Sequence, residues 1–215
     1  MTIYDISQEV FNCQVFPGDP KPERRVLSSI EKGDLCNLTA FNMCAHNGTH
    51  VDAPFHFLND GKTIDAMPME SFVGWCFLAR PFHNEFTKDE EISEAYSLSA
   101  TEAKAMMAKA SSLHCEKRIL LAGNVLVTEE AAEVFANAQI YLLGVESQSV
   151  GPVQAPKAVH MILLSKEIVL LEGIRLKNLP EGRYFLSAAP LNLSGCDGAP
   201  CRAFLLREEE FKQEL

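Results

Sequence analysis

The chain is short of positive charge, and this shortage bears on the partners it can have. Lysine and arginine together number 19, against 29 aspartate and glutamate residues, which gives a formal net charge of -10. Because this charge repels phosphate groups, neither nucleic acid nor an anionic membrane surface is expected as a partner. A small molecule is the expected ligand.

Long apolar runs and paired cysteines are also missing. No apolar run reaches the roughly 18 residues of a membrane span, and Met1 to Val10 lacks the basic start of a signal peptide. The seven cysteines are scattered without a CxxC pair, so we expect neither a disulfide framework nor a thiolate zinc site. We therefore predict a reduced, cytoplasmic protein with a single domain over 1–215.

Histidine, by contrast, is concentrated in one short stretch. Residues 46–56 hold three of the six histidines and one aspartate. Glycine, proline and two β-branched residues in this stretch disfavour a helix, so we predict an extended chain. Side chains alternate faces in an extended chain, so four ionisable groups should point to one side: His46, His50, Asp52 and His56.

This grouping is typical of a metal site. His50 and Asp52 should lie about 7 Å apart at the backbone and can tilt onto one ion, while Gly48 lets the chain bend so that His46 joins them. Two imidazoles and a carboxylate suit Zn, Fe, Mn or Co. The alternative is a solvated polar loop with hydrogen-bonded histidines. Cys44 is either a further thiol ligand or a small buried hydrophobe.

The stretch reads His-x-Gly-Thr-His-x-Asp-x-Pro-x-His, and this pattern resembles the signature of the cyclase family of metal-dependent hydrolases. That family includes bacterial kynurenine formamidases and isatin hydrolase. The resemblance implies that His46, His50 and Asp52 bind metal and that His56 is the catalytic acid/base.

The same resemblance bears on the roles of two residues further along the chain. His160 stands in the apolar run 159–164, where a lone histidine is typically a satisfied core residue. Glu172 follows the apolar residues 168–171 and must be paired, exposed or coordinated, because an isolated buried charge is costly. The resemblance implies that both are metal ligands. One or two ions of Zn or Mn per subunit are then expected, roughly 3.5 to 4 Å apart if there are two.

Other segments resemble the family with substitutions. Phe16 precedes Pro-Gly-Asp where kynurenine formamidases usually have a tryptophan that contacts the aromatic substrate, so it either stacks on a substrate ring or packs in the core. Glu146 and Ser149 take the places of an aspartate and a serine, and the role of Glu146 is left open. The segment 195–202 resembles a terminal Asp-Gly-Ser-Pro-x-Arg element, which we interpret as a structural turn.

Local patterns predict several elements of the fold. The segments 25–29 and 36–42 should form a hairpin, 72–82 a buried strand and 83–91 a surface loop. A capping box at 99–102 should start a helix, and strand, helix and strand over 118–145 suggest a crossover unit. The resemblance implies an α/β protein with a mixed, barrel-like β core and flanking helices, of the swivelling β/α/β type. Members of the family are commonly homodimers or higher homo-oligomers.

These observations together predict hydrolysis of a carbon-nitrogen bond. A metal with this donor set lowers the pKa of a water that it binds from about 15.7 toward about 7 and polarises a carbonyl. His56 can move protons, because the ordinary pKa of histidine is about 6.5. The resemblance implies N-formylkynurenine or another aryl amide as substrate. The alternatives are a cyclic-amide hydrolase of the isatin type, a metal-dependent binding protein without turnover and a structural metal site.

Overall fold

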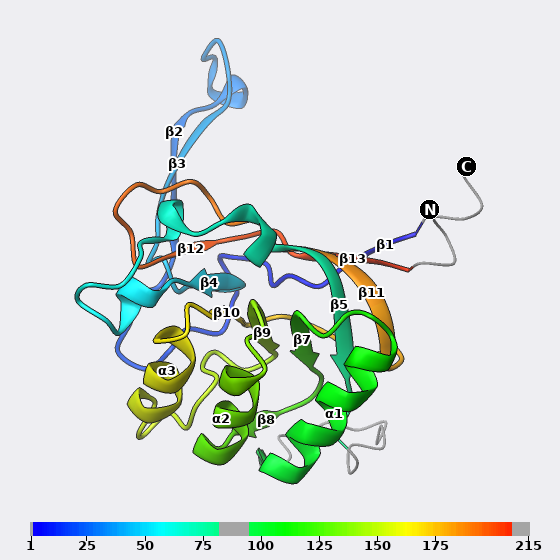
Figure 1. Ribbon diagram of the computed structural model, residues 1–215. Coiled ribbons are helices and arrows are strands. Elements are labelled where there is room, and N and C mark those ends of the chain that lie inside the picture. The colour runs from blue at the N-terminus through cyan, green and yellow to red at the C-terminus, as the bar shows by residue number, and fades with distance from the viewer. Residues whose placement is uncertain (1, 82–94, 208–215) are drawn as a thin grey trace.

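The protein is built around one large curved sheet. The computed structural model describes residues 2–81 and 95–207, so the surface loop predicted over 83–91 lies outside the described residues. Nine strands pair in the order β1-β13-β11-β5-β7-β9-β10-β4-β12 and curl into half a barrel, with three helices packed on one face (Figure 1). The predicted α/β class, with a mixed barrel-like β core and flanking helices, is confirmed.

The strands are short, with three to seven residues each. The strands are β1 (Ile3–Asp5), β2 (Glu23–Ser28), β3 (Leu38–Asn42), β4 (His50–Asp52), β5 (Val73–Ala79), β6 (Tyr96–Leu98), β7 (Arg118–Leu121), β8 (Val125–Val127), β9 (Leu142–Val145), β10 (Val169–Glu172), β11 (Gly182–Ser187), β12 (Gly198–Pro200) and β13 (Phe204–Arg207). The α-helices are α1 (Ala100–Ser112), α2 (Glu129–Asn137) and α3 (Lys157–Leu164). Single 3-10 turns are η1 (Ile30–Lys32), η2 (Pro54–His56), η3 (Ile64–Ala66) and η4 (Met69–Ser71).

The centre of the sheet is parallel and its two edges are antiparallel. Strands β5, β7, β9 and β10 run parallel, and α1, α2 and α3 lie in the successive crossovers between them. Every residue of β7, β9 and β10 is buried, as expected where both faces of a parallel sheet are covered. Strands β4 and β12 extend the sheet antiparallel beyond β10. The crossover unit predicted over 118–145 is present.

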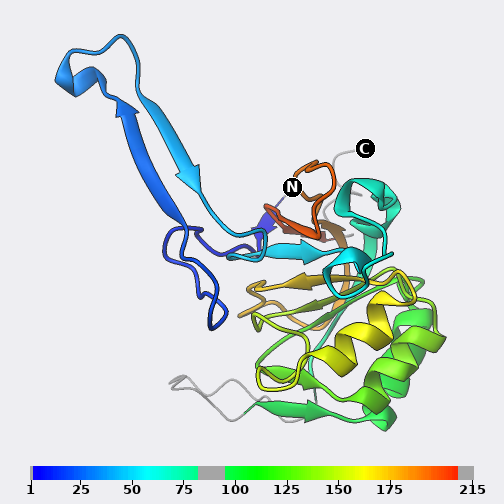
Figure 2. The ribbon, with the colours of Figure 1, turned by 90° about the vertical axis from the view of Figure 1, so that its left-hand side faces the viewer.

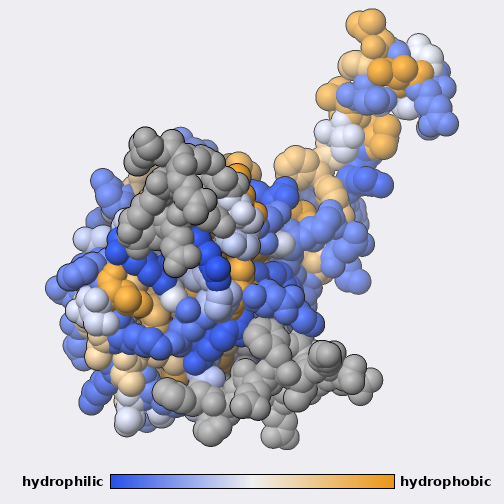
Figure 3. All heavy atoms as spheres, turned by 90° about the vertical axis from the view of Figure 1, so that its right-hand side faces the viewer, coloured by the Kyte–Doolittle hydropathy of each residue, from blue (hydrophilic) through white to orange (hydrophobic). Residues whose placement is uncertain are grey.

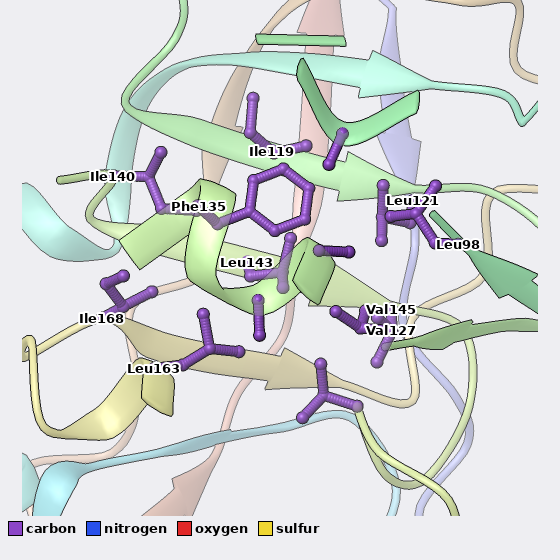
Figure 4. Packing of buried hydrophobic residues seen from close by; sticks show 14 of the residues in the cluster. Leu98, Ile119, Leu121, Val127, Phe135, Ile140, Leu143, Val145, Leu163 and Ile168 are labelled. Atoms are coloured by element: carbon purple, nitrogen blue, oxygen red, sulfur yellow. The ribbon is translucent and has the colours of Figure 1, made fainter. Parts of the chain in front are cut away.

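The core has two parts, one on each face of the sheet. Successive residues of β7 alternate between them: Ile119 and Leu121 face the helices, while Leu120 joins the cluster on the other face. Phe135 of α2 is fully buried against the helix-covered face, where Figure 4 shows it packed near Ile119 and Leu143. Full burial of such a side chain contributes about 1.5–3 kcal/mol. Both parts together fix the strands whose ends carry the polar residues described below.

Two helix starts follow from local sequence. The Ser99 hydroxyl accepts the Glu102 amide at 3.3 Å and the Glu102 carboxylate accepts the Ser99 amide at 3.1 Å, so the predicted capping box is present at the start of α1. Thr128 caps α2 in the same manner through the Ala131 amide at 3.2 Å. Within the described part of the chain, no helix has both the length and the apolar character needed to cross a bilayer.

The hairpin predicted before residue 43 also forms, and it stands away from the body. Strands β2 and β3 pair only with each other and extend as an arm (Figure 2). Gly33, which ends η1 near the tip, has φ +92°, a conformation that glycine adopts without strain. We call residues 23–42 the β arm.

Candidate metal centre

Strand β4 places two of the polar residues, because it lies between β10 and β12 at one edge of the sheet. In the register of these strands His50 lies opposite Glu172 of β10. The His50 Nε2 atom is 3.6 Å from the Glu172 Oε2 atom and 3.4 Å from the Asp52 Oδ1 atom. All three side chains are almost completely buried. The strand pairing therefore brings Glu172 to the histidine run from more than a hundred residues away in sequence.

The extended chain predicted over 46–56 is wrong outside β4. Residues 45–49 form a turn in which Gly48 has φ +69°, and a Cβ atom there would lie 3.5 Å from Cys13 Cβ. The bend returns His46 to the strand, where its Nδ1 atom lies 2.8 Å from Asp52 Oδ1. The predicted bend at Gly48 is present, and His46 joins the other residues through this bend instead of through strand alternation.

A second departure from the extended chain brings His56 to the same cluster. Pro54 starts the 3-10 turn η2, as its fixed φ favours, and His56 ends that turn. The His56 and His46 rings lie 4.0 Å apart between centroids at a tilt of 30°. The His56 Nδ1 atom is 3.0 Å from the Oδ2 atom of Asp197, which also lies 2.8 Å from His46 Nε2. Asp197 thus contacts both imidazoles.

His160 reaches the same place from helix α3, which packs against β10. Its Nδ1 atom is 2.7 Å from the Pro156 carbonyl, and its Nε2 atom is 3.5 Å from Glu172 Oε1. His50 is held in the same manner, with Nδ1 3.0 Å from the Gly48 carbonyl. A carbonyl accepts only from N–H, so Nδ1 of each ring carries the proton. Both rings therefore direct Nε2 toward the carboxylates, with Nδ1 held by a backbone carbonyl as in metal-binding histidines.

The carboxylates give this place a strong preference for positive charge. Burial opposes a charge on His46, but its hydrogen bonds with Asp197 and Asp52 outweigh burial and raise its pKa to about 11. Burial likewise opposes a charge on His50, and Asp52 and Glu172 raise its pKa to about 9. When protons leave the imidazoles, a divalent cation supplies the same positive charge.

The donor set also fits a divalent metal in its geometry. Within the described residues, two groups hold possible ligand atoms that all lie within 4.8 Å of one another: His46, Asp52 and His56, and His50, Asp52 and Glu172. His50 Nε2 and Asp52 Oδ2 are buried and have no hydrogen-bond partner among the described residues. Such atoms are costly unless something binds them, and a cation with nitrogen and oxygen ligands satisfies both.

Other residues singled out in the sequence lie elsewhere. Phe16 is half-buried in the loop between β1 and β2, and contact with a substrate stays a prediction. The backbone of Cys44 donates to Asn47 Oδ1 at 2.8 Å, and its thiol is in neither group of possible ligands. Glu146 accepts the backbone amides of Leu176, at 2.8 Å, and Gly123. Glu146 therefore joins two loops.

The sequence did not single out two residues that the structure brings to the cluster. Asp197 belongs to the segment that we interpreted as a structural turn, and its place in a terminal Asp-Gly element was the signal that could have identified it. Phe57 stacks on His160 with ring centroids 4.4 Å apart and meets the edge of His56 at 4.7 Å. Its position directly after His56 was the available signal.

Comparison with known proteins identifies the family. The family model described as putative cyclase matches residues 4–152. The chain belongs to the cyclase family. A kynurenine formamidase from Salinibacter ruber is 33% identical to this cyclase-family chain over 209 residues, which cover 95% of the chain and 97% of that relative. The family is one of metal-dependent hydrolases, as the sequence predicted, and the donor set described above suits a divalent metal.

Solved structures agree with this assignment. A protein described as a potential metal-dependent hydrolase with cyclase activity has 28% sequence identity and a TM-score of 0.72, over 95% of this chain and 96% of that one. Isatin hydrolase A from Labrenzia aggregata, bound to benzyl benzoate, has 21% identity and a TM-score of 0.75, over 95% and 93% of the two chains. The second likeness shows that the fold is shared.

Proposed function

We propose that this metal-dependent amide hydrolase acts on aryl formamides, with N-formylkynurenine as the first substrate to test. The kynurenine formamidase that resembles nearly the whole chain supports this substrate class. One observation carries the proposal, namely the convergence of imidazoles and carboxylates from β4, β10, α3 and the adjoining turns. The residues proposed as metal ligands are His46, His50, Asp52, His160 and Glu172.

We further propose that these residues hold one or two ions of Zn or Mn. The two oxygens of Asp52 face different neighbours: Oδ1 lies 2.8 Å from His46 Nδ1, and Oδ2 lies 3.8 Å from His160 Nε2. A carboxylate between two sets of donors supports a pair of ions. A bound metal supplies an activated water and polarises the substrate carbonyl. Metal analysis of the purified protein, repeated after chelation and reloading, tests the identity and the number of the ions.

His56 is the proposed proton carrier for the reaction. Its Nδ1 atom faces Asp197, which leaves Nε2 to exchange a proton with water or with the departing nitrogen. Its side chain is 27% exposed, whereas those of His50 and His160 are almost completely buried, so a substrate can approach it. His56 is therefore more exposed than each proposed histidine ligand, of which His46 is 13% exposed.

The assigned role of His56 is tested by His56→Ala with metal content measured in the same sample. We expect turnover to fall about 10²- to 10⁴-fold, the usual contribution of general acid/base catalysis, with the metal still bound. His114→Asn is the matched control, because His114 lies outside the cluster at φ +53°, which asparagine tolerates. Turnover near that of the unmodified protein in metal-loaded His56→Ala would exclude the role.

Substrate class is tested by comparing hydrolysis of N-formylkynurenine and isatin by the metal-loaded protein. We propose that Phe16 stacks on the aromatic ring of the substrate, so Phe16→Ala should raise KM for an aryl formamide more than for a small aliphatic formamide. Hydrolysis of isatin alone would favour the cyclic-amide alternative. Tight binding of either compound without turnover in any metal form would favour a binding protein.

We also propose that two or more copies of the chain associate through the β arm. A two-stranded hairpin alone is only marginally stable in water. This hairpin also carries exposed apolar side chains on its surface (Figure 3). Patches of this kind usually mark an interface. The apolar residues of the arm that are about half or more exposed are Val26, Leu27, Ile30, Leu35, Leu38 and Phe41.

Sedimentation of a charged variant tests this assembly. Leu35 is 99% exposed, so Leu35→Asp should leave the fold of one copy intact and lower the mass of the particle in solution. Lys32→Glu, which changes charge beside the tip without removing apolar surface, is the control. An unmodified protein that sediments as a monomer would refute the proposal.

Two further expectations belong to the same proposal. We propose that the chain works as one domain in the cytoplasm. The two core clusters lie on opposite faces of one sheet, which supports a single folding unit. All seven cysteines are free thiols, which supports a reducing compartment. Localisation of the tagged protein in cells, together with a single unfolding transition for the metal-loaded protein, tests both.

A further inference from the structure

Asp197 connects the two parts of the cluster that have different proposed roles. Its Oδ2 atom lies 2.8 Å from Nε2 of His46, a proposed metal ligand, and 3.0 Å from Nδ1 of His56, the proposed proton carrier. A single carboxylate oxygen therefore accepts from both rings. Asp197 lies 141 residues from His56 in sequence, so this contact exists only in the folded chain.

The backbone around Asp197 is held without the help of its carboxylate. The Asp197 carbonyl accepts the Ala53 amide at 2.9 Å, and the next residue, Gly198, pairs with Asp52 in the register of β12 and β4. A Cβ atom on Gly198 would lie only 2.8 Å from His46 Cε1, so the chain passes directly against the His46 ring. Main-chain bonds and the Asp65 carboxylate hold this segment, and the Asp197 carboxylate contacts the two imidazoles.

The contact with Asp197 determines which His56 nitrogen carries the proton. An ionised carboxylate has no proton to donate, so His56 must place its N–H at Nδ1 to make this hydrogen bond. Nε2 then keeps its lone pair and can take a proton. The ring also lies near His46, Phe57 and His160, at 4.0, 4.7 and 6.2 Å between centroids. A carboxylate oxygen of Asp52 lies within 4.8 Å of a His56 nitrogen, farther than the 3.0 Å contact with Asp197. Contacts between ring faces and edges do not select a tautomer, whereas a hydrogen bond does.

We propose that Asp197 is a positioning residue that acts through His56. Its carboxylate holds the His56 ring in one direction and in the tautomer with the proton on Nδ1, as a carboxylate does for a catalytic histidine in unrelated hydrolases. Its second contact, with His46, keeps the proton carrier at a fixed place relative to the metal ligands. This inference rests on the proposed function, which assigns His56 the role of proton carrier, and adds Asp197 to the residues that support that role.

Asp197→Asn is the central variant, since asparagine keeps the shape but offers a donor NH2 as well as an acceptor oxygen and so no longer requires the N–H of His56 at Nδ1. In the zinc-loaded protein we expect kcat to fall about 10- to 100-fold with KM changed less than about twofold and metal content unchanged. In the His56→Ala background the same substitution should change kcat less than about twofold, because the residue through which it acts is gone. Equal losses in both backgrounds, or loss of metal, would overturn the proposal.

Asp65→Asn is the matched control for a disturbed loop. The Asp65 Oδ1 atom accepts the Gly195 amide at 3.1 Å, so this carboxylate holds the same segment without touching a histidine. We expect Asp65→Asn to leave kcat unchanged. A fall in kcat that matches that of Asp197→Asn would mean that the segment as a whole matters and that the contact with His56 does not.

A second measurement does not need turnover and separates this proposal from the proposed function. The ring nitrogens of His56 in zinc-loaded protein labelled with ¹⁵N-histidine should give the signals of the tautomer with the proton on Nδ1, and Asp197→Asn should shift them toward the other tautomer. A proton on Nε2 in the unmodified protein would overturn the proposal. If the tautomer is as stated but no amide is hydrolysed, only the proposed function fails.

Discussion

Replacing Gly198 by alanine tests whether the edge of the sheet holds His46 for metal. The added Cβ atom would lie 2.8 Å from His46 Cε1 and 2.8 Å from the Val51 carbonyl oxygen. Carbon atoms in contact normally lie about 3.5 to 4.0 Å apart, so the overlap with His46 is about 0.7 Å or more. Strand β4, which carries Val51, is paired on both sides and cannot retreat. His46 or β12 must therefore move.

The overlap should lower both the stability of the metal-free protein and its affinity for Zn. Overpacking of this kind typically costs about 1–3 kcal/mol, which lowers the midpoint of urea unfolding of the metal-free protein. Displacement of a ligand by several tenths of an ångström should weaken Zn binding about 10- to 100-fold, the range found when the support of a metal ligand is lost. Competition with a chelator of known affinity measures the second effect, and denaturant titration measures the first.

Gly144→Ala is the control that separates the two effects. Its Cβ atom would overlap Leu120 Cδ2 and lie 3.2 Å from Ile174 Cδ1, inside the sheet and away from the histidines. This variant should lose stability while its Zn affinity stays within about twofold. If Gly198→Ala kept its Zn affinity despite a comparable loss of stability, His46 would not be a ligand held by this edge.

Two further predictions follow from the same surroundings. The pKa values of about 11 for His46 and about 9 for His50 lie above the ordinary value, so their charged forms stabilise the metal-free protein below about pH 6.5. That stability should be lost as pH rises through 9 and 11. Binding of Zn should displace about two protons from these imidazoles at pH 7.5, and calorimetry in buffers of different ionisation enthalpy measures this release. Thr49→Val should cost about 1–3 kcal/mol in urea unfolding, because the Thr49 hydroxyl accepts the Gln8 amide at 2.9 Å and donates to the Gly173 carbonyl at 2.8 Å.

Features that depend on neighbouring residues could be predicted from the sequence. The capping box at Ser99 was correct because its two hydrogen bonds join residues three apart, and the single cap of α2, in which Thr128 accepts the Ala131 amide, is equally local. The concentration of candidate ligands over 46–56 was visible because these ionisable residues lie close together along the chain. The bend at Gly48 followed from the conformational freedom of glycine.

Features that depend on pairing between distant segments could not be predicted. Strand β12 has only three residues and forms because β4 offers it a free edge, so nothing in its own composition indicated a strand. The short parallel pair of β6 with β8 was missed for the same reason. Asp197 precedes β12, and its meeting with His56 depends on this pairing. The segment was consequently interpreted as a turn.

The position of the cluster follows from where the sheet changes from parallel to antiparallel. Strand β10 ends with Glu172 at the carboxyl edge of the parallel strands, where ligands of open α/β sheets usually bind. Strand β4 runs back beside it, so His50 lies opposite Glu172 and Asp52 lies opposite Leu170, with the ligand atoms of His50, Asp52 and Glu172 within 4.8 Å of one another. Strand β12 then covers β4 and supplies Asp197 from the turn before it. Three short strands thus bring buried ionisable groups together at this edge, so a cation bound here would also stabilise the folded chain.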